Sequence, residues 1–166
     1  MCAEAGIEGG QMKKMFVAAL TCTALVAPGY SSAHVVGKND PNDVSGRLDV
    51  RRFGMEHGNK ILLGVKFDQS VNKGDFAQGN SAGFNLEING DAVPDRKVTI
   101  KRKKGKLKCT VFKTENDNRV GSVSADLNGA KVECELPERL LSRKPKALNA
   151  FSFYNDAQDL TDILEH

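Results

Sequence analysis

The chain has 166 residues and carries 24 Lys and Arg against 21 Asp and Glu, which gives a formal net charge of +3 at pH 7. This small positive excess does not by itself imply a nucleic acid or a membrane as partner. A chain of this length forms one domain that buries roughly two-thirds of its unfolded-chain surface, so it needs no metal or disulfide simply to have a core.

The N-terminal segment has the features of a secretory signal peptide. Lys13 and Lys14 follow a second methionine, Met12, and residues 15–27 form an apolar run that is too short to span a bilayer. Small residues at 31–33 then provide a cleavage site after Ala33. We therefore expect translation to start at Met12, residues 1–33 to be removed, and the mature chain to be secreted or held in the cell envelope, with no membrane span.

Period-2 alternation of apolar and polar residues predicts about eight β-strands and no long helix. After an extended lead-in at 34–45, the expected strands are 46–55, 60–68, 84–89, 97–101, 106–111, 119–125, 130–136 and 147–154. A break in the alternation at Arg52 and Phe53 predicts a β-bulge, and residues 69–82 predict a long surface loop. Residues 155–166 are expected to form an acidic tail, unstructured or with a short terminal helix. The pattern predicts a single antiparallel β-sandwich over 46–154, jelly-roll or immunoglobulin-like.

Two cysteines, Cys109 and Cys134, remain beyond the leader, and both occupy apolar positions of predicted strands. In an oxidising compartment they are candidates for a disulfide, which would close a loop of about 26 residues and contribute roughly 3.5 kcal/mol in the chain-entropy model. In a simple meander, the strand at 119–125 would separate them by about 9.5 Å, which is too far. A disulfide therefore requires their strands to lie in opposite sheets, and two buried thiols are the alternative.

An acidic turn provides the candidate metal site. Oxygen-bearing groups recur at every second position, as in a calcium loop, at Glu87, Asn89, Asp91, the Val93 carbonyl and Asp95. No bidentate Glu follows at the twelfth position, which is Val98. The same residue types also suffice for an ordinary hairpin turn, so Ca²⁺ binding is one of two interpretations.

A basic stretch provides a candidate anion-binding site, consisting of Lys101, Arg102, Lys103, Lys104, Lys106 and Lys108. Such a concentration of charge suits an anionic wall polymer or an acidic glycan. No aromatic residues interleave with it, which disfavours single-stranded nucleic acid. The alternative is a solvated hairpin whose lysines oppose edge-to-edge aggregation.

Residue types typical of carbohydrate binding and catalysis are scarce. Trp is absent, and Tyr154 and Phe76 are the candidates for an exposed aromatic platform. The histidines beyond the leader, at 34, 57 and 166, have neither metal-ligand spacing nor a partnered nucleophile. We therefore do not expect an enzyme.

Several short segments resemble a group of bacterial secreted β-sandwich domains. They are NDPNDVSGRLDVRRF at 39–53, the turn NGDAVPDR, the strand GKLKCTVF, VECELPERLL and ALNAFSFYND. That group is distantly similar to DOMON domains and to family-nine carbohydrate-binding modules. The resemblance implies a β-sandwich and supports the fold more than any activity.

The sequence thus predicts a non-enzymatic secreted module with a binding or structural role at or outside the cell envelope. The alternative is a carbohydrate-binding or anionic-polymer-binding module assisted by calcium, with an extracellular glycan or wall polymer as partner. Nucleic acid is not expected, and a small secreted hydrolase is a remote alternative.

Overall fold

A computed structural model describes residues 34–41, 43 and 46–166 of the chain. The predicted leader and signal peptide, residues 1–33, lie outside the described residues. Among the described residues, no helix is long and apolar enough to cross a membrane.

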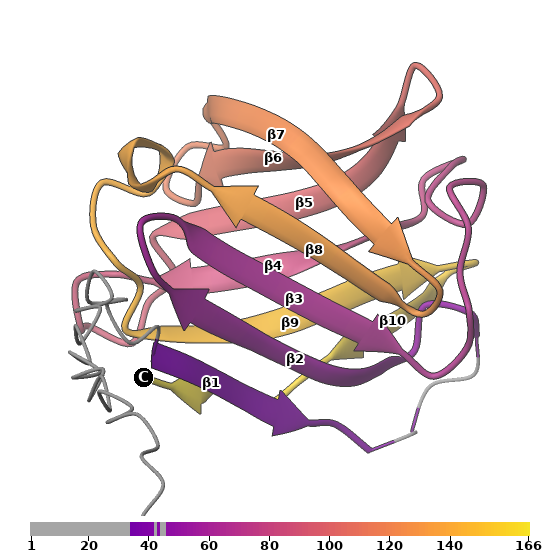
Figure 1. The fold of residues 1–166 in the computed structure, drawn as a ribbon, viewed down its shortest axis with the longest axis horizontal. Coiled ribbons are helices and arrows are strands. Elements are labelled where there is room, and N and C mark those ends of the chain that lie inside the picture. The colour runs from indigo at the N-terminus through magenta and orange to yellow at the C-terminus, as the bar shows by residue number, and fades with distance from the viewer. Residues whose placement is uncertain (1–33, 42, 44–45) are drawn as a thin grey trace, which may run out of the picture. The chain divides into compact units, whose positions relative to one another are not determined.

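The described part of the chain is all-β, with eleven strands and one short 3₁₀ helix, η1, at Glu138–Leu140. The strands are β1 (His34–Asn39), β2 (Val50–His57), β3 (Ile61–Phe67), β4 (Ser81–Glu87), β5 (Arg96–Lys103), β6 (Lys106–Lys113), β7 (Arg119–Asn128), β8 (Lys131–Leu136), β9 (Ala147–Tyr154), β10 (Ala157–Leu160) and β11 (Leu164–Glu165). All pairings are antiparallel, and the sheet runs β1-β2-β3-β8-β7-β6-β5-β4-β9-β10, with β11 also paired to β9 (Figure 1). The sheet therefore has more strands than the eight that the sequence predicts.

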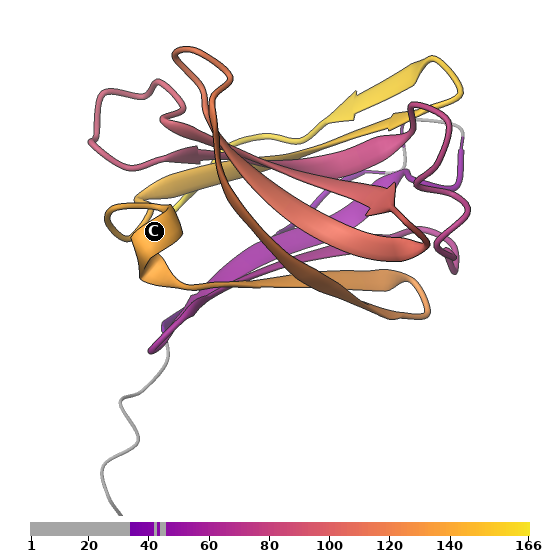
Figure 2. The same ribbon diagram turned by 90° about the horizontal axis from the view of Figure 1, so that it is seen from above.

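The all-β, antiparallel architecture is as predicted, but in place of two separate sheets one continuous sheet curls almost into a barrel, and its two halves face each other across the core (Figure 2). β7 belongs to both halves. Its first part, including Val123, pairs with β6, and its second part, from Ala125 onward, pairs with β8. The sheet turns over between these two residues, so the strands on either side of β7 lie in different halves.

This turn in β7 brings the two cysteines together. Cys109 is the cross-strand partner of Val123, and Cys134 is the partner of Ala125, so both stand beside inward positions of the same strand only two residues apart. Their Cα atoms are 6.0 Å apart and their sulfurs are at bonding distance, 1.98 Å. Both residues are fully buried. The disulfide thus forms under the condition that the sequence required, with its two strands in opposite halves.

Alternating apolar residues of both halves fill the core, and its largest side chains are those of Phe53, Phe67, Phe76 and Phe84. Phe76 comes from the long loop, where it packs edge-on against Phe67 at 5.9 Å between ring centroids. Its carbonyl accepts the N–H of Arg102, which fixes the loop to β5. A bulge is present in β2, but the register shift lies between Val50 and Arg52, just before the predicted position at Arg52 and Phe53.

Both ends of the described chain differ from the prediction. Part of the expected lead-in forms β1, which pairs with β2 along its whole length. The expected unstructured tail or terminal helix instead forms β10 and β11. Asn155 and Asp156 both have positive φ, 48° and 69°, and make the two-residue turn that returns the chain along β9. Pairing to an existing strand therefore decides the structure of this polar segment.

The two ends of the sheet approach each other without forming a backbone ladder, at a junction that we call the seam. There the N–H of Val50 on β2 donates to Asp159 Oδ2 on β10 at 2.7 Å. Lys38 on β1 forms an ion pair with Asp162 at 3.1 Å. Side chains thus connect the two ends where strand pairing stops.

Candidate functional site

The acidic turn at 87–95 uses its side-chain oxygens as acceptors for its own backbone. Asp95 accepts the N–H of Ile88 at 2.7 Å and the N–H of Asn89 at 3.2 Å. Its other oxygen accepts the Asn89 side-chain amide at 3.0 Å. Further acceptors in the turn are Glu87 for Gly90, Asn89 for Asp91 and Asp91 for Val93. These bonds account for the acidic residues as turn formers, and calcium ligation by Glu87, Asn89, Asp91, Val93 and Asp95 stays a prediction.

The predicted anion-binding residues form the hairpin of β5 and β6. Lys101 lies directly opposite Lys108, and Lys103 lies opposite Lys106. By strand alternation these four lysines share the outer face, whereas Lys104 sits in the turn, at φ 51°. Within the part of the chain that the structure describes, no ion pair involves any of the six basic residues. Like charges that face each other across a ladder are destabilising, so this surface favours an anion.

Beside this hairpin, the outer face of β9, β4 and β5 is hollowed into a groove of about 480 Å³, which we call the outer groove. Lys97 and Lys101 line it together with Phe151 and Phe153, and Asn80 and Ser81 close it from the end of the long loop. A second hollow of about 250 Å³ shares Lys97 and Lys101 and adds Phe112 on β6. The two hollows therefore make one surface across four strands.

The floor of the outer groove depends on a glycine. Gly83 on β4 is the cross-strand partner of Phe151 on β9. A Cβ at Gly83 would lie 2.7 Å from Phe151 Cζ and 1.9 Å from the carbonyl oxygen of Val98. The absence of a side chain thus lets the Phe151 ring lie against the sheet. Lys97 Nζ stands 5.4 Å from the centroid of that ring, within the range of a cation–π interaction.

Sequence reasoning found the lysines of this surface but not its aromatic residues. Phe76, a proposed platform, is buried in the core, whereas Tyr154 does line the groove. Residues 147–154 are apolar on both faces, which is typical of a strand covered on both sides. Instead, the Phe153 side chain remains 39% exposed and packs edge-on against Phe151 at 6.0 Å between centroids. An i, i+2 pair of Phe residues on a strand next to a Gly-bearing strand is the signal that could have indicated this surface.

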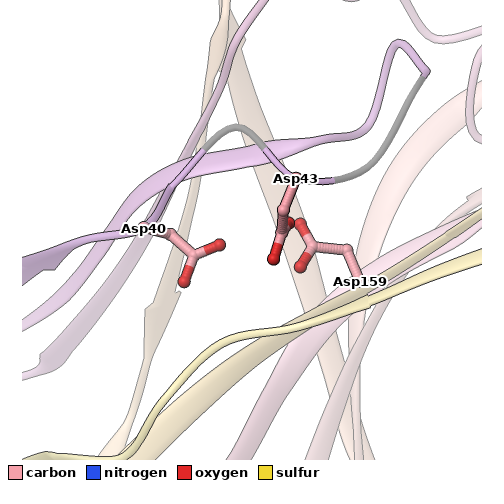
Figure 3. Close-up of side chains that lie close together, drawn as sticks. All are labelled: Asp40, Asp43 and Asp159. Carbon is pink, nitrogen blue, oxygen red and sulfur yellow. The ribbon is translucent and has the colours of Figure 1, made fainter.

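Carboxylates also converge away from the acidic turn. Asp40, Asp43 and Asp159 each bring an oxygen within 4.8 Å of the others at the seam (Figure 3). Asp40 and Asp43 follow β1, whereas Asp159 lies on β10, more than a hundred residues later in the chain. The sequence prediction did not include these residues as ligands, because only the curling of the sheet brings the two segments together.

Fold and site together define an all-β protein with a buried disulfide and a basic, aromatic-floored outer surface. No family model matches the chain, and neither a curated protein nor a solved structure matches it. The resemblance to DOMON and family-nine domains therefore gains no support from these comparisons and stays a prediction.

Proposed function

We propose that this protein is a secreted, non-enzymatic binding module whose outer groove holds an acidic polysaccharide of the cell envelope or its surroundings. The observation that carries this proposal is the combination, on one surface, of lysines without ion-pair partners among the described residues and an aromatic floor.

The two components suit the two chemical features of such a ligand. The Phe153 side chain, which is 39% exposed and packs against the buried Phe151, offers apolar area to the C–H groups of a sugar ring. Lys97 and Lys101 are four residues apart on β5, so their Cα atoms are separated by roughly 13 Å along the strand. A polymer with repeated carboxylate or phosphate groups can reach both ammonium groups at once.

A binding role is favoured over catalysis by the distribution of carboxylates. Asp117 lines the smaller hollow and Asp156 lines the outer groove, so among the described residues each hollow contains a single acid. Glycoside hydrolysis normally needs two carboxylates on either side of one bond. Secretion is supported by the disulfide and by the predicted signal peptide, since structural disulfides persist mainly outside the cytosol.

Binding of polygalacturonate, a carboxylated glycan, tests the proposal against neutral dextran and against polyglutamate, which is anionic but not a sugar. We expect the protein to bind polygalacturonate most tightly of the three polymers. Its affinity for polygalacturonate should fall as the salt concentration rises. The double variant Lys97→Gln/Lys101→Gln should lose about tenfold in affinity, as expected for two exposed charge pairs. Phe153→Ser should lower the affinity for polygalacturonate and leave the affinity for polyglutamate unchanged.

Lys131→Gln is the matched control, because Lys131 lies on β8 and already pairs with Glu133 at 2.7 Å. It should bind polygalacturonate like the wild type. If the protein binds polyglutamate and polygalacturonate equally and Phe153→Ser changes neither affinity, the site recognises negative charge alone and not a sugar. Absence of binding to either anionic polymer at low salt would overturn the proposal.

A further inference from the structure

The seam gathers acidic side chains from both ends of the sheet. In Figure 3 the carboxylates of Asp40, Asp43 and Asp159 point toward a common space between the segment after β1 and strand β10. Asp159 is buried, Asp40 is half-buried and Asp43 is exposed. The group therefore extends from the protein surface inward.

A fourth carboxylate beside this group is buried without a hydrogen bond. Asp49 is 2% exposed, and neither of its side-chain oxygens has a hydrogen-bond partner in the part of the chain that the structure describes. It immediately precedes Val50, whose N–H donates to Asp159 Oδ2. Asp49 is therefore next in the chain to the residue that contacts the buried member of the cluster. A buried ionised carboxylate without a partner is costly, and a bound cation removes that cost.

The basic side chains of this region are engaged elsewhere. Lys38 pairs with Asp162, Arg47 with Asp75, and Arg51 with Asp68. Across the described residues, no ion pair reaches Asp40, Asp43, Asp49 or Asp159. Among the described residues, the seam thus concentrates four carboxylates, none of which forms an ion pair.

We propose that Asp40, Asp43 and Asp159, with Asp49 beside them, bind a calcium ion that connects the end of β1 to strand β10. Calcium binds six to eight oxygens at about 2.4 Å, so two ligands on opposite sides of the ion are about 4.8 Å apart. The mutual 4.8 Å limit met by Asp40, Asp43 and Asp159 matches this spread. The ligand set consists of oxygen alone, which suits a hard cation and not zinc. This site is independent of the outer groove.

Calorimetric titration of the chelator-treated protein with CaCl₂ tests the site directly, together with thermal unfolding in calcium and in chelator. We expect one calcium per chain and a higher unfolding temperature in calcium, with magnesium binding at least about tenfold more weakly. Asp43→Asn and Asp49→Asn should each weaken calcium binding by about tenfold or more. Asp43 is exposed, so its variant is expected to fold in the absence of calcium as the wild type does.

Asp91→Asn in the acidic turn is the matched control and should bind calcium as the wild type does. The proposal is overturned if calcium produces neither heat nor a shift in unfolding temperature. It is overturned equally if Asp91→Asn abolishes binding while Asp43→Asn does not, because calcium would then occupy the turn. If the four carboxylates hold shared protons in place of a metal, the titration will be flat at pH 7.

Discussion

The two halves of the sheet are joined at two places by opposite kinds of chemistry. At β7 the joint is covalent and apolar, because one strand passes from one half to the other and the Cys109–Cys134 disulfide lies buried beside it. At the seam no strand continues, and the contact between Val50 and Asp159 lies beside three further carboxylates. One joint thus consists of uncharged side chains, and the other is lined by acidic ones.

The acidic turn shows that a group of carboxylates does not by itself destabilise the folded state. Asp95 accepts three hydrogen bonds from N–H donors, whereas the side chain of Asp49 accepts none from the residues that the structure describes. A carboxylate with two or three donors stabilises the folded state as an anion, and a buried one without donors destabilises it. Replacing the carboxylate should therefore lower the free energy of unfolding in the acidic turn and raise it at Asp49.

The largest expected effect is at the covalent joint. Replacing Cys109 and Cys134 together by Ala should lower the free energy of unfolding by roughly 3.5 kcal/mol, from the entropy of a loop of about 26 residues. Denaturant unfolding of the variant and the wild type measures this difference. The loss should be the same with and without calcium. A loss that disappears in calcium would mean that the two joints are not independent.

The seam should give a pH dependence of nearly the same size in the absence of divalent cations. Burial, followed by the charges of Asp159, Asp68 and Asp43, raises the pKa of Asp49 from 3.8 to about 6, while Arg51 opposes the shift. Burial and the same acidic surroundings raise the pKa of Asp40 to about 6. In both cases the folded state binds the proton more tightly than the unfolded state. The resulting destabilisation is absent below pH 3.8, grows from there to about pH 6 and is complete above it.

For Asp49 this shift corresponds to about 3 kcal/mol. The stability difference between Asp49→Asn and the wild type, measured by denaturant unfolding from pH 4 to 7.5, isolates it from other carboxylates. The free energy of unfolding of the variant should increase relative to that of the wild type as the pH rises. Calcium should reduce this difference. A difference that does not change with pH would mean that Asp49 does not titrate in this range.

The acidic turn should respond in the opposite direction. Asp95→Ala removes the acceptor of three hydrogen bonds and should lower the free energy of unfolding by about 2 kcal/mol at pH 7. Asp49→Asn should raise it under the same conditions without calcium. Parallel unfolding of the two variants measures both signs, and two losses of equal size would remove the distinction between donor-rich and donor-free carboxylates.

Local alternation was sufficient to predict the strands that build both halves. The strand at 60–68, the bulge near Arg52 and the condition for the disulfide all follow from which side chains point inward. The strands at the two ends of the fold could not be predicted in this way. Residues 34–39 and 157–165 become strands only by pairing with β2 and β9. The Asn155-Asp156 turn was the one local signal for the second of them.

The candidate sites divide in the same way. The lysines of the β5–β6 hairpin are adjacent in sequence and were found there. Phe151 and Lys97 meet only because β4 lies between their strands with Gly83 at the crossing. Asp43 and Asp159 meet only when the sheet has curled. Sequence spacing therefore detects a site made by one hairpin and misses a site made by two ends of a sheet.

The smallest effect belongs to the exposed part of the seam. Lys38 and Asp162 form an ion pair at 3.1 Å, but their side chains are 38% and 83% exposed. Solvent and salt screen such a pair, so Lys38→Gln should change the free energy of unfolding by less than about 0.5 kcal/mol at 0.15 M salt. Denaturant unfolding at low and moderate salt measures the change. A loss above about 2 kcal/mol would make Lys38 the cation that holds the seam together, and the cluster of Asp40, Asp43, Asp49 and Asp159 would then no longer need a metal to explain how the sheet closes.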